Sequence, residues 1–382
     1  MKVFLVAGEL SGDRLGGALM DGLCQLAPGV EFAGVGGPMM AAEGLESLFP
    51  MEELSVMGLA EVLPKLWHLI GRKKQVVQAA LDWQPDVVIT IDAPDFGLRV
   101  AKGIKAASDI RTVHYVAPSV WAWRPGRAAK MARYIDHVLA LLPFEPPYME
   151  AAGMACDFVG HPVVNEPVAT EAEVAGFRAA HGIDGEMMLM LPGSRRGEVE
   201  RLAERFGETM RQVITARPGL RVVIPAAEPV AGLLEDLTAG WSVAPILLDP
   251  RGVEAAEFAA TKRAAFRAAD VALAASGTVS LELAASGTPM VIGYDFGWIS
   301  RQILPRLALI DTVTLVNLVT ESRVIPEYVL DNCRAGPMAD AISEVLDAPE
   351  AQAAVLALTM ERLGRGGEAP GLRAARAVLD RL

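Results

Sequence analysis

Cysteines are few in this sequence, and several well-known enzyme motifs are missing. The 382 residues include three cysteines, Cys24, Cys156 and Cys333, which lie far apart and form no C-x-x-C pair. This spacing argues against a metal knuckle and fits a reducing compartment. The chain also has no D-x-D, H-E-x-x-H, G-x-S-x-G or Walker motif. These absences count against D-x-D metal-dependent transferases, zinc proteases, α/β-hydrolases and P-loop NTPases.

Positive charge and long apolar runs are also scarce. A total of 35 Lys and Arg against 47 Asp and Glu gives a net charge of −12, so we expect no nucleic-acid partner. No apolar stretch reaches the roughly 18 residues needed to cross a bilayer. Residues 1–8 are apolar but too few for a signal peptide, so we predict a first strand there. We expect a cytoplasmic protein. Its mean hydropathy of +0.31 is high for such a protein and indicates exposed apolar surface that has a function.

Apolar segments of strand length alternate with helical stretches, and this rhythm breaks near residues 160–173. Because the predicted strands are apolar throughout, they indicate parallel sheets covered by helices on both faces. We therefore predict an α/β fold with two Rossmann-like domains, residues 1–165 and 166–348, followed by C-terminal helices over residues 349–382. The predicted strands are residues 2–7, 32–35, 86–91, 112–116, 138–142, 187–191, 221–225, 245–248, 271–275 and 289–292.

A strand-to-helix turn at residues 274–283 has the pattern of a nucleotide-sugar site. The strand breaks at Gly277 and a helix opens, and a helix N-terminus suits a diphosphate. Glu282 lies four residues after Thr278 on the same helix face, from where a carboxylate could accept both hydroxyls of a ribose. The alternative is a helix capped by Ser276 or Thr278 with Glu282 in solvent, and the local pattern favours neither.

The loop Gly8–Asp13 follows the first predicted strand, where α/β sheets bind ligands. Gly8 and Gly12 would let a ligand approach the backbone closely. The alternative is a turn in which Ser11 or Asp13 caps the next helix. We favour the functional interpretation because the loop lies at the first strand–helix crossover.

Two further strand ends carry polar side chains. Asp92 and Asp95 flank Pro94, and one of them could be a general base if its surroundings raise its pKa. A capping or turn role is the alternative, natural for Asp beside Pro. Residues 191–199 contain a Gly-Ser turn with arginines before a helix, which suits phosphate, and Arg195 could neutralise a leaving diphosphate. A capping turn with surface arginines is the alternative there.

Two aromatic segments have less specific patterns. Trp121 and Trp123 alternate with small residues, and at least one of them is expected to fill the core. Residues 57–75 combine an apolar helical face that includes Trp67 with basic residues, which can lie on an anionic membrane surface. An ordinary amphipathic helix is the more common outcome of this pattern.

Taken together, these motifs resemble the bacterial lipid-A-disaccharide synthase family. The matching segments run in the family's order across nearly the whole chain. Residues 249–258 and the Ala-rich C-terminus match weakly, which puts oligomeric state and tail packing in doubt more than chemistry. The matching segments are residues 7–13, 51–58, 91–96, 114–124, 142–145, 160–162, 191–199, 275–282 and 315–318.

The resemblance implies a fold and a reaction. It implies two Rossmann-like domains facing a cleft, the GT-B type, with the last helices packed back on the first domain. The family joins UDP-2,3-diacylglucosamine to 2,3-diacylglucosamine 1-phosphate with inversion, giving a β-1,6-linked disaccharide 1-phosphate and UDP. It needs no metal or other cofactor and acts at the cytoplasmic face of the inner membrane. A homodimer that exchanges C-terminal parts is known in the family, and this sequence does not decide it.

The resemblance also assigns roles to residues. Asp92 would deprotonate the acceptor's 6-hydroxyl, while Arg195 and the amides of Gly277 and Thr278 would stabilise the departing UDP. Glu282 would hold the ribose. The remaining expected substrate-binding residues are Glu9, Ser11 and Asp13 on the acceptor side, together with Asp95, Gly193, Ser194, Ser276, Ser280 and Asn317.

Two other functions fit parts of the pattern. A UDP-N-acetylglucosamine 2-epimerase shares the fold and the UDP cradle but has no use for a membrane-facing segment. A UDP-sugar-binding or membrane-scaffold protein would keep the Glu282 site but would need neither Asp92 nor Arg195. Turnover of an acylated donor separates the transferase from both.

Overall fold

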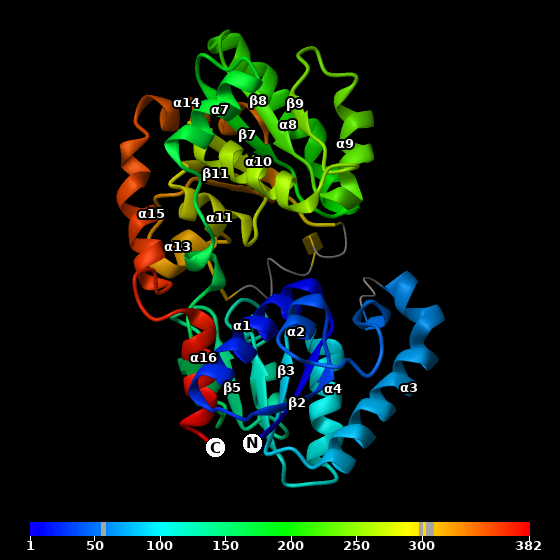
Figure 1. Cartoon of the computed structure of the whole chain (residues 1–382). Helices are drawn as coiled ribbons and strands as arrows, with labels where there is room; N and C mark the ends of the chain where they lie inside the picture. The colour runs from blue at the N-terminus through cyan, green and yellow to red at the C-terminus, as the bar shows by residue number, and fades with distance from the viewer. Residues whose placement is uncertain (55–58, 298–300, 303–308) are drawn as a thin grey trace. The chain divides into compact units, whose positions relative to one another are not determined.

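The computed structural model describes residues 1–54, 59–297, 301–302 and 309–382, with the side chains of residues 59–65 also left out (Figure 1). The chain divides into two compact units. The first combines Met1–Asn165 with Leu363–Leu382, and the second is Glu166–Arg362. Each unit has a parallel six-stranded sheet with helices, so the predicted α/β class with two Rossmann-like units is confirmed.

The sheet of the first unit has the strand order β2-β1-β3-β4-β5-β6. Its central strands are buried on both faces, as the unbroken apolar runs predicted. The strands are β1 (Lys2–Ala7), β2 (Glu31–Val35), β3 (Val87–Ile91), β4 (Arg111–Tyr115), β5 (His137–Ala140) and β6 (Ala155–Phe158). The α-helices are α1 (Leu10–Leu26), α2 (Pro38–Ala42), α3 (Leu59–Trp83), α4 (Pro94–Lys105), α5 (Gly126–Met131), α6 (Pro146–Glu150) and α16 (Pro370–Leu379).

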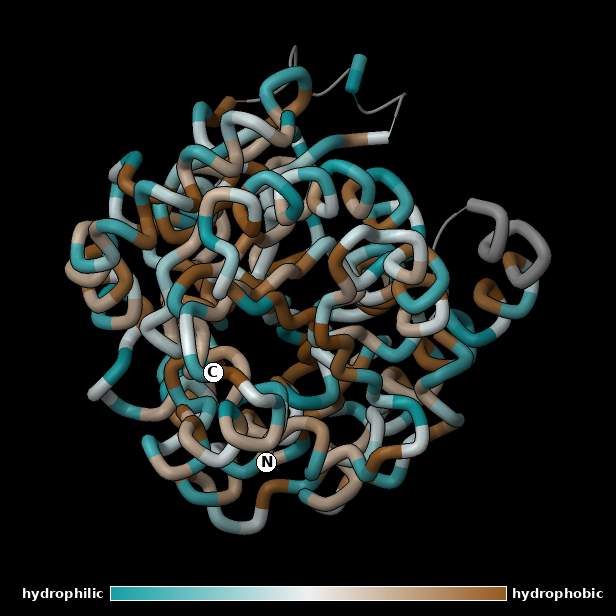
Figure 2. Tube along the Cα trace, turned by 90° about the horizontal axis from the view of Figure 1, so that it is seen from above, coloured by the Kyte–Doolittle hydropathy of each residue, from teal (hydrophilic) through white to brown (hydrophobic). Residues whose placement is uncertain are grey.

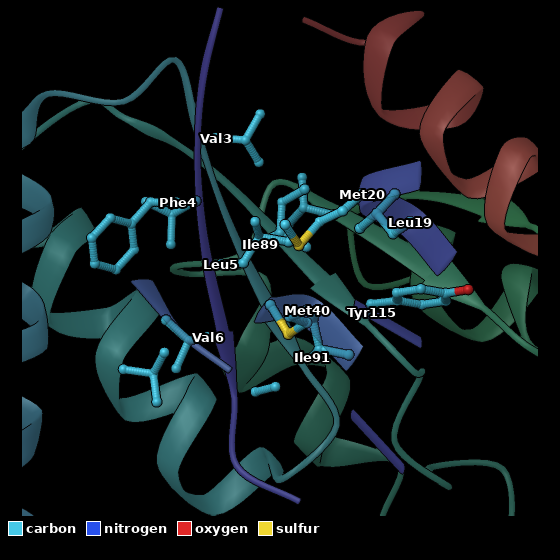
Figure 3. Packing of buried hydrophobic residues seen from close by; sticks show 14 of the residues in the cluster. Val3, Phe4, Leu5, Val6, Leu19, Met20, Met40, Ile89, Ile91 and Tyr115 are labelled. Carbon is cyan, nitrogen blue, oxygen red and sulfur yellow. The ribbon is translucent and has the colours of Figure 1, made fainter. Parts of the chain in front are cut away.

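The core of the first unit lies between its sheet and the surrounding helices, among them α1, α2, α3, α4 and α16. Leu5 of β1 and Ile89 of β3 lie close to Met20 of α1 in Figure 3, and all three are fully buried. Figure 2 shows the wider pattern, with hydrophobic residues gathered on inner segments and hydrophilic ones recurring on the outer turns of helices. This burial is the main source of the unit's stability.

The sheet of the second unit has the order β12-β11-β10-β7-β8-β9. Its strands are β7 (Met187–Leu191), β8 (Arg221–Pro225), β9 (Ile246–Leu248), β10 (Val271–Ala274), β11 (Met290–Tyr294) and β12 (Glu327–Val329). Its α-helices are α7 (Glu171–Ala180), α8 (Arg196–Ala216), α9 (Ala231–Thr238), α10 (Ala255–Ala268), α11 (Val279–Ser286), α13 (Leu315–Thr320), α14 (Ala335–Asp347) and α15 (Glu350–Arg362).

All ten predicted strands are present, with ends that differ by at most two residues. Two strands were missed, β6 and β12, and each lies at the outer edge of its sheet. Both are short and only partly buried, so they lack the apolar run that marks a central strand.

The C-terminal residues are shared between the two units. Helix α15 belongs to the second unit, while α16 packs on α1 of the first. A Cβ at Gly371 would lie 2.4 Å from the carbonyl oxygen of Ala18, so this helix crossing requires glycine. The His161 amide donates to the Leu363 carbonyl at 3.2 Å, and Arg373 donates to the Phe158 carbonyl at 2.9 Å. The range 349–382, predicted as one group of helices, is therefore divided.

Candidate active site

The second unit contains a cavity of about 770 Å³ at the carboxyl ends of its strands. β7 is hydrogen-bonded to β10 on one side and to β8 on the other, so the turns after these strands meet at one edge of the sheet. α10 contributes further lining side chains. The residues predicted from the sequence that line this cavity are Gly193, Ser194, Arg195, Ser276, Gly277, Thr278 and Glu282.

The turn after β7 brings Arg195 to the cavity. Gly193 has φ +118°, and a Cβ there would lie 2.7 Å from the Cβ of Glu198, so the turn requires glycine. The Arg195 side chain is 67% exposed and has a loose ion pair with Glu198, 3.6 Å from Nη1 to Oε1. Sequence reasoning missed Glu198, which also accepts a hydrogen bond from the Tyr294 hydroxyl. Arg195 is therefore free to reach an anionic ligand in the cavity.

The turn after β10 leads directly into α11. Gly277 has φ +155° and open space where a side chain would be. Thr278 precedes α11 without a capping hydrogen bond from its side chain, and the Ser276 hydroxyl donates to the Val313 carbonyl at 2.9 Å. Thr278 is therefore the N-cap residue, as the alternative predicted, but neither side chain forms a capping hydrogen bond. The first amides of α11 have no side-chain acceptor from this turn, as an anion site requires.

Glu282 projects from α11 toward α10. Its Oε2 lies 2.7 Å from the Nζ of Lys262, and both residues line the cavity. The Lys262 ammonium also lies over the Phe266 ring, 5.0 Å from its centroid. Glu282 is therefore paired inside the site, and the alternative of a carboxylate left in solvent is wrong. Sequence reasoning missed Lys262, since nothing in an Ala-rich helix marks one lysine as facing a cavity.

Two predicted site residues of the second unit are fully buried and do not line the cavity. The Ser280 hydroxyl is fully buried and donates to the Gly277 carbonyl at 2.9 Å, which holds the turn. Asn317 is also fully buried, and its side-chain amide bonds to both backbone groups of Ile325, at 2.9 and 3.0 Å.

In the first unit, the structure joins two of the predicted loops at Asp92. The Ser11 hydroxyl donates to Asp92 Oδ2 at 2.7 Å, although 81 positions separate the two residues. Asp92 and Ala93 have φ values of +49° and +37°, unusual for residues other than glycine. The Asp92 amide donates to the Tyr115 carbonyl at 2.9 Å, which fixes the turn to β4. Backbone held in this way is typical of functional sites.

The glycines of the first loop serve packing. A Cβ at Gly12 would lie 3.1 Å from the Ile91 carbonyl oxygen, and one at Gly8 would lie 3.1 Å from the Cβ of Ala93. Small residues here let the start of α1 approach the turn after β3. The interpretation that Gly8 and Gly12 clear space for a ligand is therefore wrong, because protein atoms fill that space.

The Asp13 side chain caps the neighbouring helix α2. Its carboxylate is 1% exposed and accepts from the amides of Gly37, Met39 and Met40 at 2.8, 2.9 and 3.0 Å. These amides form the N-terminus of α2, so the side chain caps α2 and does not cap its own helix. Glu9, in contrast, directly precedes α1 and is not buried, and Asp95 is exposed in the first turn of α4.

A second cavity, of about 280 Å³, contains Asp92. The loop after β4 supplies its opposite wall, beginning at Val116, which has φ +85° despite its branched side chain. Trp123 lines this cavity with the Arg124 guanidinium 3.8 Å from its ring centroid. Trp121 is buried instead and donates to Glu145 Oε1 at 3.2 Å, so the expectation of one core tryptophan is confirmed. Burial raises the pKa of Glu145 to about 7.

Two general properties concern the described part of the chain as a whole. Within it, no three His, Cys, Asp or Glu side chains are grouped so that they could hold a metal ion. None of the described helices is long and apolar enough to cross a bilayer.

The two units, each built on a parallel six-stranded sheet, define a fold of the GT-B type. Solved structures with a similar fold include the UDP-GlcNAc 2-epimerase of Neisseria meningitidis bound to UDP-GlcNAc, with a TM-score of 0.65 and 12% identity, covering 100% of this chain and 99% of that one. The UDP-GlcNAc 2-epimerase of Methanocaldococcus jannaschii has a TM-score of 0.62 and 14% identity, with the same coverage. At these identities the likeness establishes the fold alone.

Sequence comparison is more specific. The family model for lipid-A-disaccharide synthetase matches residues 3–365. The lipid-A-disaccharide synthase of Ruegeria pomeroyi is 63% identical over 383 residues, covering 100% of this chain and 96% of that protein. That of Rhodospirillum centenum is 46% identical over 387 residues, covering 100% and 94%. The chain therefore belongs to the lipid-A-disaccharide synthetase family, as its motifs predicted.

Proposed function

We propose that the chain transfers diacylglucosamine from UDP-2,3-diacylglucosamine to the 6-hydroxyl of 2,3-diacylglucosamine 1-phosphate. The products are the β-1,6-linked disaccharide 1-phosphate and UDP. One observation in the structure supports this most: Arg195, the Gly277 turn and Glu282 line a single cavity at the strand ends of the second unit. An arginine, free helix amides and a carboxylate are the groups that a nucleoside diphosphate requires.

In this proposal the second unit binds the UDP moiety. The diphosphate would lie against the N-terminus of α11, whose amides and dipole favour negative charge. Glu282 would accept the ribose hydroxyls, with Lys262 holding the carboxylate in place. Gly193, Ser194 and Ser276 would line the binding site, while Ser280 and Asn317 would support its walls.

The first unit would supply the base. The Ser11 hydroxyl occupies Asp92 Oδ2, which leaves Oδ1 to accept the proton of the acceptor's 6-hydroxyl. The acceptor oxygen then forms a bond to the anomeric carbon while the bond from that carbon to the UDP oxygen breaks, with inversion. Arg195 and the amides of Gly277 and Thr278 meet the negative charge that grows on the departing diphosphate. Glu9 and Asp95 would border the acceptor, while Asp13 would act through α2.

Both substrates carry acyl chains, so we also propose that the protein works at the cytoplasmic face of the inner membrane. The Trp67 side chain supports this proposal, because it is 82% exposed on α3, and an exposed indole suits a membrane interface. Residues 57–58 of the predicted membrane segment lie outside the described residues, as do the side chains of residues 59–65. The family can form a homodimer that the sequence here does not decide, and sedimentation of the purified protein would test it.

The experiment that tests the proposed function measures UDP release from UDP-diacylglucosamine in detergent micelles with excess chelator. Release that depends on diacylglucosamine 1-phosphate and yields a disaccharide phosphate is the expected result. Epimerisation of UDP-N-acetylglucosamine with no use of acylated donor would contradict it. Tight UDP binding without turnover of any donor would instead favour a binding protein.

A further inference from the structure

A basic cavity lies along α4 and α5 in the first unit. Its volume is about 820 Å³, and the carboxylate of Asp95 is the acidic side chain among its lining residues. Its basic lining residues are Arg99, Lys102 and Lys105 from α4, with Arg127, Lys130 and Arg133 from α5 and the turn after it. Six basic side chains thus gather in one cavity of a chain whose net charge is −12.

Most of these charges have no partner in the described structure. Lys105 forms an ion pair with Asp136, 2.7 Å from Nζ to Oδ2. The other five basic side chains make no hydrogen bond or ion pair to any described residue. Like charges along one wall repel one another and create a positive potential that an anion relieves. The cavity therefore has the electrostatics of an anion site.

The position of the basic cavity relates it to Asp92. It shares Pro94 and Arg127 with the smaller cavity that contains Asp92. Arg127 is half-buried, and its charge, after burial, helps to lower the pKa of His114 to about 3. An anion held by Arg127 would therefore lie beside the site where the acceptor hydroxyl meets its base.

We propose that the basic cavity binds the phosphate of diacylglucosamine 1-phosphate and makes the enzyme select a phosphorylated acceptor. This inference rests on the proposed function. The planar guanidinium group of an arginine can donate two parallel hydrogen bonds to the oxygens of a phosphate monoester, which carries nearly two negative charges. The donor's diphosphate has its own proposed site in the second unit, around Arg195, so the acceptor supplies the remaining anion. A membrane lipid headgroup has related chemistry, and the test separates the two sources.

The test compares two acceptors, 2,3-diacylglucosamine 1-phosphate and 2,3-diacylglucosamine without its phosphate, in neutral detergent micelles. We expect the unsubstituted protein to prefer the phosphorylated acceptor. Arg99→Ala and Arg133→Ala, which line the basic cavity and not the Asp92 cavity, should each lower kcat/KM about tenfold for that acceptor, mainly through KM, and leave the other acceptor unchanged. Arg211→Ala is the matched control, since it removes an exposed arginine from α8 that pairs with Glu208.

Other outcomes overturn the inference. Equal losses of kcat/KM with both acceptors would show that the arginines have a structural role. Equal kcat/KM of the unsubstituted protein for the two acceptors would show that it has no site for the acceptor phosphate. Weaker binding to vesicles of anionic phospholipid with unchanged acceptor selectivity would assign the cavity to a lipid headgroup. If the protein shows no transfer at all, the proposed function fails, and calorimetry still tests the cavity. Glucosamine 1-phosphate, but not glucosamine, should then bind, and Arg99→Ala should weaken that binding.

Discussion

The two units use glycine after a strand for different purposes. In the second unit, Gly277 has positive φ, lines a cavity and has open space where a side chain would lie. In the first unit, Gly8 and Gly12 are covered by Ala93 and by the carbonyl of Ile91. The topological position is the same in both cases. What lies beside the turn, not the presence of glycine, separates a ligand site from a packing contact.

Their polar groups differ in the same way. Among the candidate groups of the second unit, the Arg195 side chain is 67% exposed and has a loose ion pair with Glu198. Those of the first unit are held by the protein itself, with Ser11 on Asp92 and three amides on Asp13. The second unit therefore has the character of a binding site for charge, and the first that of a scaffold that would orient the proposed base.

Substitution of Asp92 should have the largest effect. Asp92→Asn removes the proposed base and should lower kcat by about 10²- to 10⁴-fold. UDP affinity should not change, because the cavity proposed to bind UDP lies in the other unit. Steady-state kinetics and calorimetry with UDP measure the two quantities. Ser11→Ala, which keeps the carboxylate but removes its hydrogen bond, should have a smaller effect. A near-normal kcat for Asp92→Asn would exclude Asp92 as the base and favour Asp95.

Arg195 provides the matching test of the second unit. Arg195→Ala should lower kcat by about 10²- to 10³-fold and weaken UDP binding, because the charge on the leaving diphosphate loses its partner. Thermal stability should not change, since the side chain is exposed. The adjacent Arg196→Ala is the control, because that side chain pairs with Glu200 and does not line the cavity. Equal losses in both variants would point to a general charge effect.

Asp13 should behave as a structural residue. Asp13→Ala leaves three amide groups at the N-terminus of α2 without their acceptor, that of Met40 in a buried position, so we expect the free energy of unfolding to fall by about 3 kcal/mol. Urea denaturation measures this change. UDP affinity should stay the same where the variant is folded. A variant of normal stability with a raised KM for the acceptor would instead show that Asp13 contacts substrate.

The smallest expected effect is a pH dependence at Glu145, behind the Asp92 cavity. Burial raises its pKa from 4.5 to about 7, so the folded state binds the proton more tightly than the unfolded state. The contribution to stability is therefore complete below pH 4.5 and decreases, by about 2–3 kcal/mol, as pH rises to about 7.

Glu145→Gln removes this titration and keeps an acceptor for Trp121. The difference in unfolding free energy between the two proteins, measured in urea from pH 5 to pH 8, isolates the effect. Burial lowers the pKa values of His114, His137 and His161, and these act in the opposite direction but are common to both proteins. A difference that does not vary with pH would mean that Glu145 is already ionised.

Elements and turns were predictable from the sequence to different degrees. Apolar runs predicted the central strands because burial on both faces leaves a continuous local signal. The same local view placed Ser276, Gly277 and Glu282 together, since a strand, a turn and a helix adjoin in the chain. A short sequence window could not reveal Lys262, which pairs with Glu282 although 20 positions separate them. Nor could it reveal the three amides, 24 to 27 positions away, from which Asp13 accepts hydrogen bonds. Such partners depend on which helices pack together, which no short window contains.

The return of the chain to the first unit has a consequence for biosynthesis. Residues Leu363–Leu382 are made only after the whole second unit has been synthesised. Until then α1 lacks its neighbour α16, and the side of α1 at Ala18 and Gly22 has nothing to pack against it. The first unit can therefore complete its core only after the second unit has been synthesised, and shorter nascent chains expose a surface that chaperones recognise.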